Sequence, residues 1–470
     1  MSKENFETII TFPAFEIDDG ERRKRPPVNV LPMAACVEQQ GISSVRVIDG
    51  ESLGLSPEDL AGEILRNRPQ IVGISVYTPA YSQAQALLAR VKELRPEVLT
   101  VLGGKHPTHC YRDVLQDPNV DFVVVGEGEE ALPKIVAAKQ SHPTTRAMQQ
   151  SLASEPGIAF RERDYVPLTN RVDLRGLPPI NWKVLYPDLE FYLQSEDNFL
   201  IESSRGCFGK CTFCLAAGYR KGIAYKPLDV FLEELRFLAS KGFQRFFLTD
   251  DDAMANYRHI KKILEGVRNE NLSLTLETNV RADSFVKCAQ QEDFLVLAKA
   301  AGLQVIHLGI ESGSPEILAY CQKGIELRQV REGVRLATQA GLIVESNFII
   351  GLPPDNERTI RESMDFALEL RKFGPHLPHI SIFMPYPGTQ AYDDAIREGL
   401  LDPRVLDFTQ LNVHKGAVVP TQFLTKKEVE TLYNEFYDRL YSIEFMDNIR
   451  GKCPNIFALA KSLVTKRLNS

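Results

Sequence analysis

Apolar residues along the chain fall into two alternating patterns. Short continuous apolar runs are typical of strands buried on both faces of a sheet, and longer segments with helical spacing are typical of the helices that cover it. In the first third, the predicted strands are Thr8–Phe12, Val45–Ile48, Gln70–Tyr77, Leu99–Leu102 and Asp121–Val125. The predicted helices between them are Val30–Gln40, Pro57–Asn67 and Tyr81–Leu94, with one more after the last strand. Residues 1–136 are therefore predicted to form an α/β domain with a doubly wound parallel sheet.

The same alternation returns after residue 195. The predicted strands are Phe199–Ser203, Arg245–Leu248, Ser273–Glu277, Val305–Ile310, Ile343–Ile350 and His379–Met384. The helices that follow the first five are predicted at Pro227–Lys241, Tyr257–Asn269, Gln291–Ala301, Leu327–Ala340 and Glu357–Phe373. Six such units predict a partial (β/α)6 barrel over residues 195–400. Right-handed crossovers would bring the carboxyl ends of all six strands to one rim.

Two further segments complete the predicted organisation. Residues 137–194 begin with a polar stretch that has few strand or helix signals, so we interpret them as a linker. Residues 401–470 are predicted to form a helical C-terminal region, with helices at Thr425–Arg439 and Asn455–Arg467. The first of these helices opens with Thr425 followed three residues later by Glu428, the pattern of a capping box.

Composition narrows the functional classes. The chain has 470 residues, enough for two or three domains, and a net charge of −7 that argues against a nucleic-acid partner. Met1–Thr11 lacks the layout of a signal peptide, and no apolar run is long enough to cross a bilayer. Eight cysteines in a chain of this length do not form a disulfide framework. We therefore expect a cytoplasmic protein without a membrane partner.

A cysteine triad marks the candidate chemistry. Cys207, Cys211 and Cys214 form a C-x3-C-x2-C array in the loop after the first predicted barrel strand. A [4Fe–4S] cluster is normally held by four thiolates, so three would leave one iron open for a small molecule. Zinc remains the alternative, although no fourth Cys or His follows within the next thirty residues. The residues alone favour an iron–sulfur cluster.

Motifs beyond the triad follow in a fixed order: TDDD, RAD, GIESGS, GLP and PYPGT. This order over residues 195–400 resembles the core of the radical SAM superfamily, in the subgroup that carries a cobalamin-binding domain. The resemblance implies that Cys207, Cys211 and Cys214 hold a [4Fe–4S] cluster whose open iron binds S-adenosylmethionine (SAM). It also implies cofactor-binding roles for Phe213, Asp250, Asp251, Arg281, Glu311, Ser312 and Gly351.

The resemblance assigns different parts of SAM to these residues. Asp250 and Asp251 match positions near the amino group, and Arg281 matches a position near the carboxylate. Glu311 and Ser312 match the segment near the ribose, and Gly351 the turn along the adenine. The structural alternatives are helix capping for the aspartates and a salt bridge at the barrel mouth for Glu311.

The N-terminal third carries a second resemblance. The stretches VGISVYT, GGKHPTH and DFVVVGEGE over residues 8–135 resemble the cobalamin-binding domain of radical SAM enzymes. The contacts that this implies lie at strand ends: Ser75, Tyr77, Thr78, Gly103, Gly104, His106, Gly126, Glu127 and Gly128. An Asp-x-His-x-x-Gly stretch is absent from the sequence, so a lower axial histidine is not expected. We expect His106 and His109 to be polar groups of a loop, or hydrogen-bond partners for the amides of the corrin. The alternative is a scaffold that holds no cofactor.

Together the resemblances imply an enzyme that cleaves SAM to a 5′-deoxyadenosyl radical. The first hypothesis is cobalamin-dependent methylation of an unactivated carbon in a small-molecule or peptide natural product. The alternative enzyme is a radical SAM cyclase, dehydratase or rearrangement enzyme, and a third hypothesis is a non-catalytic corrinoid- or metal-binding protein. A flavodoxin or ferredoxin is the expected electron donor. No catalytic residue is assigned.

Overall fold

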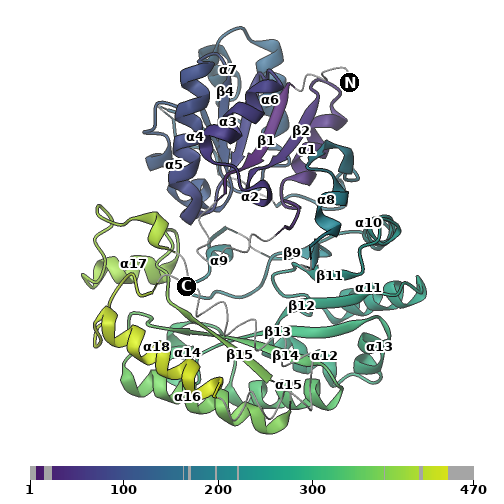
Figure 1. The fold of residues 1–470 in the computed structure, drawn as a ribbon, viewed down its shortest axis with the longest axis vertical. Coiled ribbons are helices and arrows are strands. Elements are labelled where there is room, and N and C mark those ends of the chain that lie inside the picture. Colours follow the sequence, from purple (N-terminus) through teal and green to yellow (C-terminus); the bar gives the residue numbers. More distant parts are fainter. Residues whose placement is uncertain are drawn as a thin grey trace. The chain divides into compact units, whose positions relative to one another are not determined.

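The computed structural model describes residues 7–14, 24–161, 163–167, 171–195, 198–219, 222–374, 376–411 and 416–442. The chain divides into two compact units, residues 1–199 and 200–470, each built around its own sheet (Figure 1). No helix among the described residues is long and apolar enough to cross a membrane.

The first unit contains a sheet of seven strands in the order β6-β5-β4-β3-β1-β2-β7. The strands are β1 (Thr8–Phe12), β2 (Val45–Asp49), β3 (Ile71–Ser75), β4 (Leu99–Gly103), β5 (Phe122–Val124), β6 (Ile158–Ala159) and β7 (Leu185–Tyr186). All neighbours pair in parallel except β6, which is antiparallel to β5. Because β1 lies between β2 and β3, the strand order reverses at β1, as it does in doubly wound sheets.

Helices cover both faces of this sheet, as predicted. They are α1 (Leu31–Gln39), α2 (Gly50–Leu53), α3 (Pro57–Arg66), α4 (Tyr81–Leu94), α5 (Lys105–Val114), α6 (Ala131–Ser141), α7 (Thr145–Ser151) and α8 (Leu189–Leu193), with short 3₁₀ turns η1 (Thr78–Ala80) and η2 (Trp182–Val184). Helices α3 and α4 pack together on one face, and α1 and α6 pack together on the other (Figure 1).

The second unit is built on a sheet of six strands in the order β15-β14-β13-β12-β11-β8, which follows the order of the chain. They are β8 (Phe199–Ile201), β11 (Arg245–Leu248), β12 (Thr275–Arg281), β13 (Leu303–Glu311), β14 (Ile343–Ile350) and β15 (His376–Ile382). Strands β11 to β15 pair in parallel. A small antiparallel pair, β9 (Ser204–Arg205) and β10 (Ala224–Tyr225), precedes the first crossover helix. This is the predicted partial barrel.

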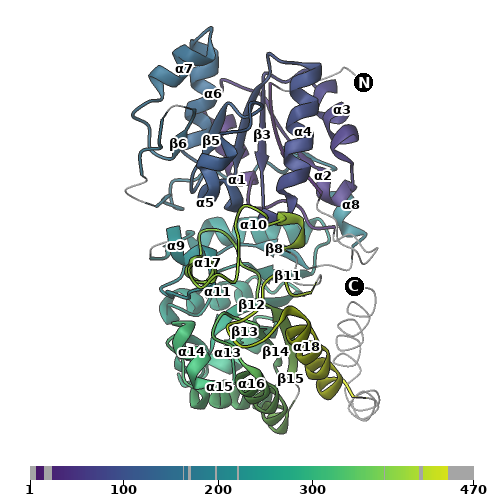
Figure 2. The same ribbon diagram turned by 90° about the vertical axis from the view of Figure 1, so that its left-hand side faces the viewer.

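Helices cover one face of the barrel sheet (Figure 1). They are α10 (Leu228–Ser240), α11 (Tyr257–Asn269), α12 (Ala282–Ala289), α13 (Phe294–Ala300), α14 (Pro315–Tyr320), α15 (Leu327–Gln339) and α16 (Glu357–Leu370). The shorter elements are α9 (Leu215–Tyr219), η3 (Arg371–Phe373), α17 (Gln390–Arg397) and η4 (Phe408–Gln410). The terminal helix of the described chain, α18 (Lys426–Leu440), packs beside α16 and the edge strand β15 (Figure 2).

Several predicted boundaries need correction. GGKHPTH, interpreted as a loop, ends β4 and forms the start of helix α5. The third barrel strand, expected at Ser273–Glu277, is β12 at Thr275–Arg281, so Arg281 ends a strand, and α12 follows it directly. The last barrel strand begins at His376 rather than His379. Helices α7, α12 and α14 were not expected.

The segment interpreted as a linker contributes both edge strands of the first sheet. Strand β6 pairs with β5, and β7 pairs with β2. The hydroxyl of Tyr192 on α8 donates a buried hydrogen bond of 2.7 Å to Oδ2 of Asp49 at the end of β2. The capping box at Thr425 and Glu428 is confirmed, whereas the helix expected at Asn455–Arg467 lies outside the described residues.

Candidate functional site

The cysteine loop leaves the first strands of the barrel and is fixed at its start by the acidic loop that follows β11. Gly206 has a φ of +107°, a conformation that favours glycine, and its N–H donates a 2.7 Å hydrogen bond to Oδ2 of Asp251. Further along, the N–H of Thr212 donates to the carbonyl of Cys321 at 3.1 Å. The loop is therefore anchored just before the first cysteine and between the second and the third.

Two cysteines of the triad lie beside Gly209. A Cβ placed on this glycine would lie 3.4 Å from Sγ of Cys207, 3.6 Å from Sγ of Cys211 and 3.3 Å from Nη1 of Arg281. The N–H of Gly209 also points to Sγ of Cys207 at 3.3 Å. Two thiols and a guanidinium thus lie close around one glycine, where an added methyl group would be in van der Waals contact with all three.

The donor set fits a cluster better than a single ion. Among the described residues, no group of three or more His, Cys, Asp or Glu side chains converges closely enough to hold one metal ion. Thiolates on one zinc lie about 3.8 Å apart, because each Zn–S bond is about 2.3 Å long, whereas an iron–sulfide core holds its thiolates further apart. Burial raises the pKa of the Cys207 thiol and raises that of Cys211 to about 11, so both thiols must lose a proton when metal binds.

The acidic loop after β11 makes hydrogen bonds to backbone N–H groups and to serine hydroxyls of the protein itself. Asp250 is fully buried and accepts hydrogen bonds from Ser203 N at 2.8 Å, Ser203 Oγ at 2.7 Å and Ser204 Oγ at 2.5 Å. Burial raises the pKa of Asp250 to about 6, although these hydrogen bonds oppose the rise. Asp252 accepts from the N–H of Arg281 and the hydroxyl of Ser284. The SAM contact predicted for Asp250 remains a prediction.

The loop after β13 holds Glu311 in an unusual backbone conformation. Glu311 has a φ of +71° and is buried, with Oε1 lying 2.5 Å from Nζ of Lys323. Next to it, the buried hydroxyl of Ser312 lies 3.0 Å from the Ser363 hydroxyl of α16, which also accepts from the N–H of Gly313. Ser312 therefore fixes the loop against α16, whereas Glu311 pairs with a lysine.

Lys323 was not singled out in the sequence. It lies 12 residues after Glu311, just beyond α14, and no motif marks it. Burial alone would lower its pKa, but the neighbouring Glu311 carboxylate and the Cys211 sulfur outweigh that effect, so the pKa is raised. The backbone carbonyl of Lys323 accepts a 2.6 Å hydrogen bond from Nη2 of Arg281. The two cations therefore belong to one network.

Phe213 and Gly351, two further predicted contacts, pack against other parts of the unit. Phe213 lies against a buried apolar cluster that includes Ile317, Cys321 and Leu352. Gly351 has a φ of +81°, and a Cβ on it would lie 2.9 Å from the Val429 side chain of α18. Both positions therefore have a structural role, and their predicted cofactor roles remain predictions.

The sheet face away from the helices is polar. Along β12 and β14, buried residues alternate with half-buried ones, and the half-buried set includes Glu277, Asn279, Glu345 and Asn347. At its centre, His307 Nε2 lies 3.1 Å from Glu277 Oε2 and its Nδ1 lies 3.3 Å from Glu345 Oε2. Burial opposes protonation, but the two carboxylates raise the pKa of His307 to about 9. The inner positions of closed barrels are instead mostly branched and apolar.

In the first unit, predicted cobalamin contacts meet at the carboxyl edge of adjacent strands. Ser75 ends β3, Gly103 ends β4 in register beside it, and Gly126 follows β5. At the point where strand order reverses, the ring of Tyr77 stacks on that of Phe12 with centroids 6.5 Å apart. Ligands bind at this place in doubly wound sheets. Lys105 Nζ also lies over the Tyr77 ring, 5.5 Å from its centroid, and the corrinoid contact predicted for Tyr77 remains a prediction.

Some glycines at this edge serve the chain's own packing. Gly104 has a φ of +95°, and a Cβ on it would lie 2.7 Å from the backbone N of Val76. A Cβ on Gly128 would lie 2.3 Å from Sδ of Met33. Neither position needs a ligand to explain its glycine.

Two charged or titratable residues at this edge also contact protein groups. His106 is buried on α5, and its ring lies 4.2 Å from that of Tyr81. Burial lowers the pKa of His106 to about 4, so its ring is neutral at physiological pH. This corrects the expectation of a polar loop residue. Glu127 accepts a 2.9 Å hydrogen bond from the N–H of Val172 and lies 3.4 Å from Arg171, while Thr78 is buried in η1.

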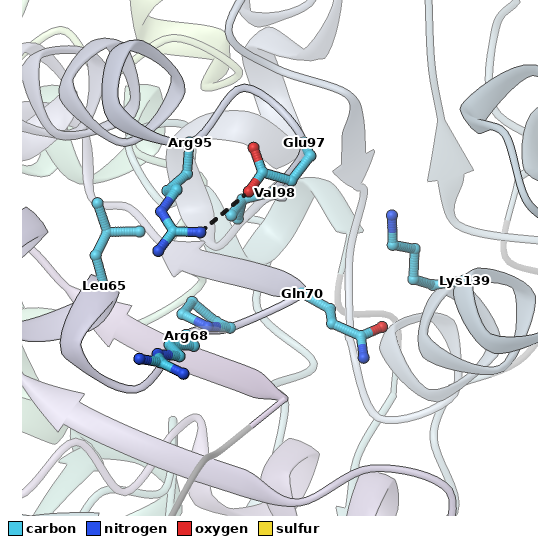
Figure 3. Close-up of a pocket in the computed structure, with 8 residues that line it drawn as sticks. Leu65, Arg68, Gln70, Arg95, Glu97, Val98 and Lys139 are labelled. Carbon is cyan, nitrogen blue, oxygen red and sulfur yellow. Dashed lines mark hydrogen bonds and ion pairs between the residues drawn. The ribbon is translucent and has the colours of Figure 1, made fainter.

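A surface pocket of about 300 Å³ lies at the opposite end of the strands of the first sheet, where their amino ends are (Figure 3). Its walls come from the segments before β3 and β4 and from α6, with Arg68, Gln70, Arg95 and Lys139 among the lining residues. These residues lie at the amino ends of the strands, whereas ligands in such sheets bind at the carboxyl ends. The pocket contains none of the predicted cobalamin contacts.

Comparison with known families agrees with the two units. The model of the B12 binding domain matches residues 24–136, and the model of the Radical SAM superfamily matches residues 201–367. The chain contains a B12-binding domain followed by a radical SAM domain. The predicted resemblance, the radical SAM enzyme class and the three cofactors, a [4Fe–4S] cluster, SAM and cobalamin, are confirmed by these matches.

Relatives of this radical SAM chain have different names. An uncharacterized methyltransferase of Pyrococcus horikoshii is 28% identical over 385 residues, 80% of this chain and 80% of the relative. An anaerobic magnesium-protoporphyrin IX monomethyl ester cyclase of Synechocystis is 26% identical over 446 residues, 91% of this chain and 85% of the relative.

A solved structure supports the fold of both units. The cobalamin-dependent S-adenosylmethionine radical enzyme OxsB, with aqua-cobalamin and S-adenosylmethionine bound, matches 98% of this chain and 71% of its own, with a TM-score of 0.74 and 16% identity. At this identity the likeness shows the fold, which confirms the predicted fold class.

Proposed function

We propose that this protein is a cobalamin-dependent radical SAM methyltransferase that methylates an unactivated carbon of a small molecule or peptide. The observation that carries the proposal is the presence, in one chain, of a B12-binding domain and a radical SAM domain whose rim holds a three-cysteine loop. When bound, the cluster and SAM supply a carbon-centred radical, and the corrinoid supplies a route for a methyl group.

The chain's own residues would hold these groups in place. Cys207, Cys211 and Cys214 are the proposed ligands of the cluster, on a loop that Asp251 fixes at Gly206. Because three thiolates leave one iron open, SAM can bind there. Arg281 and Glu311 are the proposed contacts of the SAM carboxylate and ribose.

In the first unit, Tyr77 and the strand ends at Ser75 and Gly103 are the proposed contacts of the corrinoid. Neutral His106 is buried against Tyr81, so we do not assign it to the cobalt.

The polar inner face of the barrel supports a proposal for the kind of substrate. Glu277, His307 and Glu345 lie side by side on neighbouring strands, and Asn279 and Asn347 follow two residues further towards the rim. A face of this kind favours a hydrogen-bonding substrate over a large apolar one, because buried polar groups need partners. This supports a polar small molecule or peptide.

The second candidate is a radical cyclisation without methyl transfer. It is favoured by the relative named as a cyclase, which matches 91% of this chain. Both candidates require a one-electron donor, for which we propose a flavodoxin or ferredoxin.

Labelled SAM distinguishes the two candidates. Protein purified and reconstituted anaerobically is incubated with reductant, hydroxocobalamin, a metabolite extract of the source organism and SAM that carries a trideuterated methyl group. Methylation predicts a product that gains the labelled methyl group and forms together with S-adenosylhomocysteine. A new product that forms with 5′-deoxyadenosine but carries no deuterium would contradict methylation and support the cyclase. The variant with Cys207, Cys211 and Cys214 all replaced by Ala is the control and should give neither product.

A further inference from the structure

The buried lysine beside the cysteine loop has no role in the functions discussed above. Lys323 Nζ lies 2.5 Å from Glu311 Oε1, and both side chains are only 8% exposed. A Cβ on Gly309 would lie 2.5 Å from this Nζ and 2.8 Å from this Oε1. The ion pair therefore occupies the space beside Gly309, the first residue of the GIESGS motif, on the polar face of β13. A larger residue at position 309 would displace the pair.

The backbone of Glu311 supports a functional rather than a packing role. A glutamate at a φ of +71° is strained, and such strain persists where the surrounding structure fixes it, often at ligand sites. The register of β13 against β14 also shifts between Gly309 and Glu311. The chain thus turns the Glu311 side chain out of the regular alternation of the strand, towards Lys323.

The pair is joined to the cysteine loop through a second cation. Arg281 donates through Nη2 to the carbonyl of Lys323 at 2.6 Å, and its Nη1 lies beside Gly209, next to which the sulfurs of Cys207 and Cys211 also lie. The Arg281 Nε is occupied by Asp283 at 3.0 Å. Lys323 also interacts electrostatically with the Cys211 sulfur. Both cations therefore act on the Cys211 sulfur, and Arg281 also acts on that of Cys207.

Charge balance gives this network a role. A cluster with three thiolates is anionic and becomes more so when it gains an electron, and nearby charge and hydrogen bonding set its reduction potential. A buried cation stabilises the reduced form more than the oxidised form, because the attraction grows with the negative charge and is weakly screened in a dry site. Asp283 balances the charge of Arg281. Glu311 balances the charge of Lys323 only while its carboxylate stays on Nζ of the lysine.

We propose that Lys323 is a positioning residue that orients the Glu311 carboxylate for a hydroxyl-bearing ligand and raises the reduction potential of the cluster. The proposal rests on the proposed function, since it requires a cluster at the triad. The electron comes from a one-electron donor, a flavodoxin or ferredoxin in the cell or dithionite in the test. The cluster gains one electron and the donor loses one, with no bond made or broken.

The test compares Lys323→Met with wild-type protein after anaerobic reconstitution. The midpoint potential is measured by a redox titration followed by electron paramagnetic resonance without SAM. At a fixed potential, we expect the reduced-to-oxidised ratio of the variant to fall at least tenfold, which is 59 mV for one electron. SAM changes the spectrum of the reduced cluster, and the SAM concentration that gives half of this change should be at least tenfold higher for Lys323→Met than for wild type.

Three further variants separate charge from packing. Lys226→Met is the matched control, because Lys226 forms a similarly buried 2.7 Å pair with Glu234 in the same unit; it should stay within threefold of wild type in both measurements. Lys323→Arg should keep the reduced-to-oxidised ratio at that fixed potential within threefold of wild type, because it keeps the charge. Glu311→Gln should shift the potential in the opposite direction to Lys323→Met, since it leaves the lysine charge unbalanced.

Equal iron content in all variants establishes that each carries a cluster. Lys323→Met with a wild-type potential and wild-type SAM dependence would overturn the proposal. If Lys323→Met does not fold, an unshifted or lowered potential in Glu311→Gln would overturn it instead. Wild-type protein that binds no iron would contradict the proposed function itself, which distinguishes the two failures.

Discussion

The carboxylate of Asp250 binds both the backbone and the side chain of Ser203, accepting hydrogen bonds of 2.8 Å from its N–H and 2.7 Å from its hydroxyl. Asp250 follows β11, and Ser203 lies between β8 and the cysteine loop. The first two strands of the barrel are therefore tied together at the point where the triad begins. The relationship makes Asp250 a positioning residue for the loop.

Replacing Asp250 by Asn should weaken both the fold and the triad. An amide keeps one acceptor oxygen but brings an NH2 group to a buried site that offers three donors. We expect the free energy of unfolding to fall by about 1–3 kcal/mol, together with a lower iron content. Urea unfolding and iron analysis measure the two effects. Asp229→Asn, at an exposed position in the first turn of α10, is the control. Wild-type values of both quantities in Asp250→Asn would contradict the positioning role.

His307 should make the stability of the protein depend on pH. Its pKa is about 9 in the folded protein, above the ordinary value of 6.5, because Glu277 and Glu345 outweigh the effect of burial. The stabilisation is fully present below pH 6.5 and is lost as the pH rises through 9. We expect a loss of about 3 kcal/mol, because the folded pKa of about 9 lies about 2.5 above the ordinary 6.5.

The measurement is urea unfolding of wild type and His307→Gln between pH 6 and 10. Other groups titrate in this range, so the difference between the two proteins isolates His307. We expect the difference to shrink steadily towards high pH. A difference that is constant over the range would mean that His307 is not protonated between its carboxylates.

The hydrogen bond from Tyr192 to Asp49 should stabilise the first unit. Its acceptor is buried, and burial raises the pKa of Asp49 although the hydrogen bonds oppose this. Tyr192→Phe removes the donor and leaves a buried carboxylate with one partner fewer, so we expect a loss of about 1.5–3 kcal/mol in the free energy of unfolding. Thermal and urea unfolding test this.

Tyr165→Phe is the matched control, because the Tyr165 hydroxyl makes no hydrogen bond among the described residues while its ring packs against Tyr111. Equal losses in the free energy of unfolding of the two variants would show that the hydrogen bond of the Tyr192 hydroxyl does not stabilise the first unit.

Much of the fold could be predicted from apolar periodicity. The strands Arg245–Leu248 and Ile343–Ile350 and the helices Tyr81–Leu94 and Tyr257–Asn269 have the predicted bounds. Each is a long or continuous apolar pattern that ends at a polar residue or glycine. Parallel strands joined by right-handed crossovers leave few other arrangements, so the order of the barrel strands could also be predicted.

Other elements could not be found in this way. Strands β6 and β7 have two residues each, too short to show any periodicity, so their segment was interpreted as a linker. Helix α5 contains Pro107 after two glycines, a combination that indicates a turn. Lys323 acquires its position only through tertiary structure, because α14 returns it to the strand that carries Glu311.

The measurement that tests the central claim most directly is the content of iron, labile sulfide and corrinoid after anaerobic purification and reconstitution. For wild-type protein we predict about four iron and four sulfide per chain, as a [4Fe–4S] cluster requires, and about one corrinoid. Cys211→Ala should lose the iron and keep the corrinoid, whereas Cys288→Ala, which removes a buried thiol away from the triad, should keep both. A wild-type protein with one bound zinc, no iron or sulfide and no corrinoid would contradict the account.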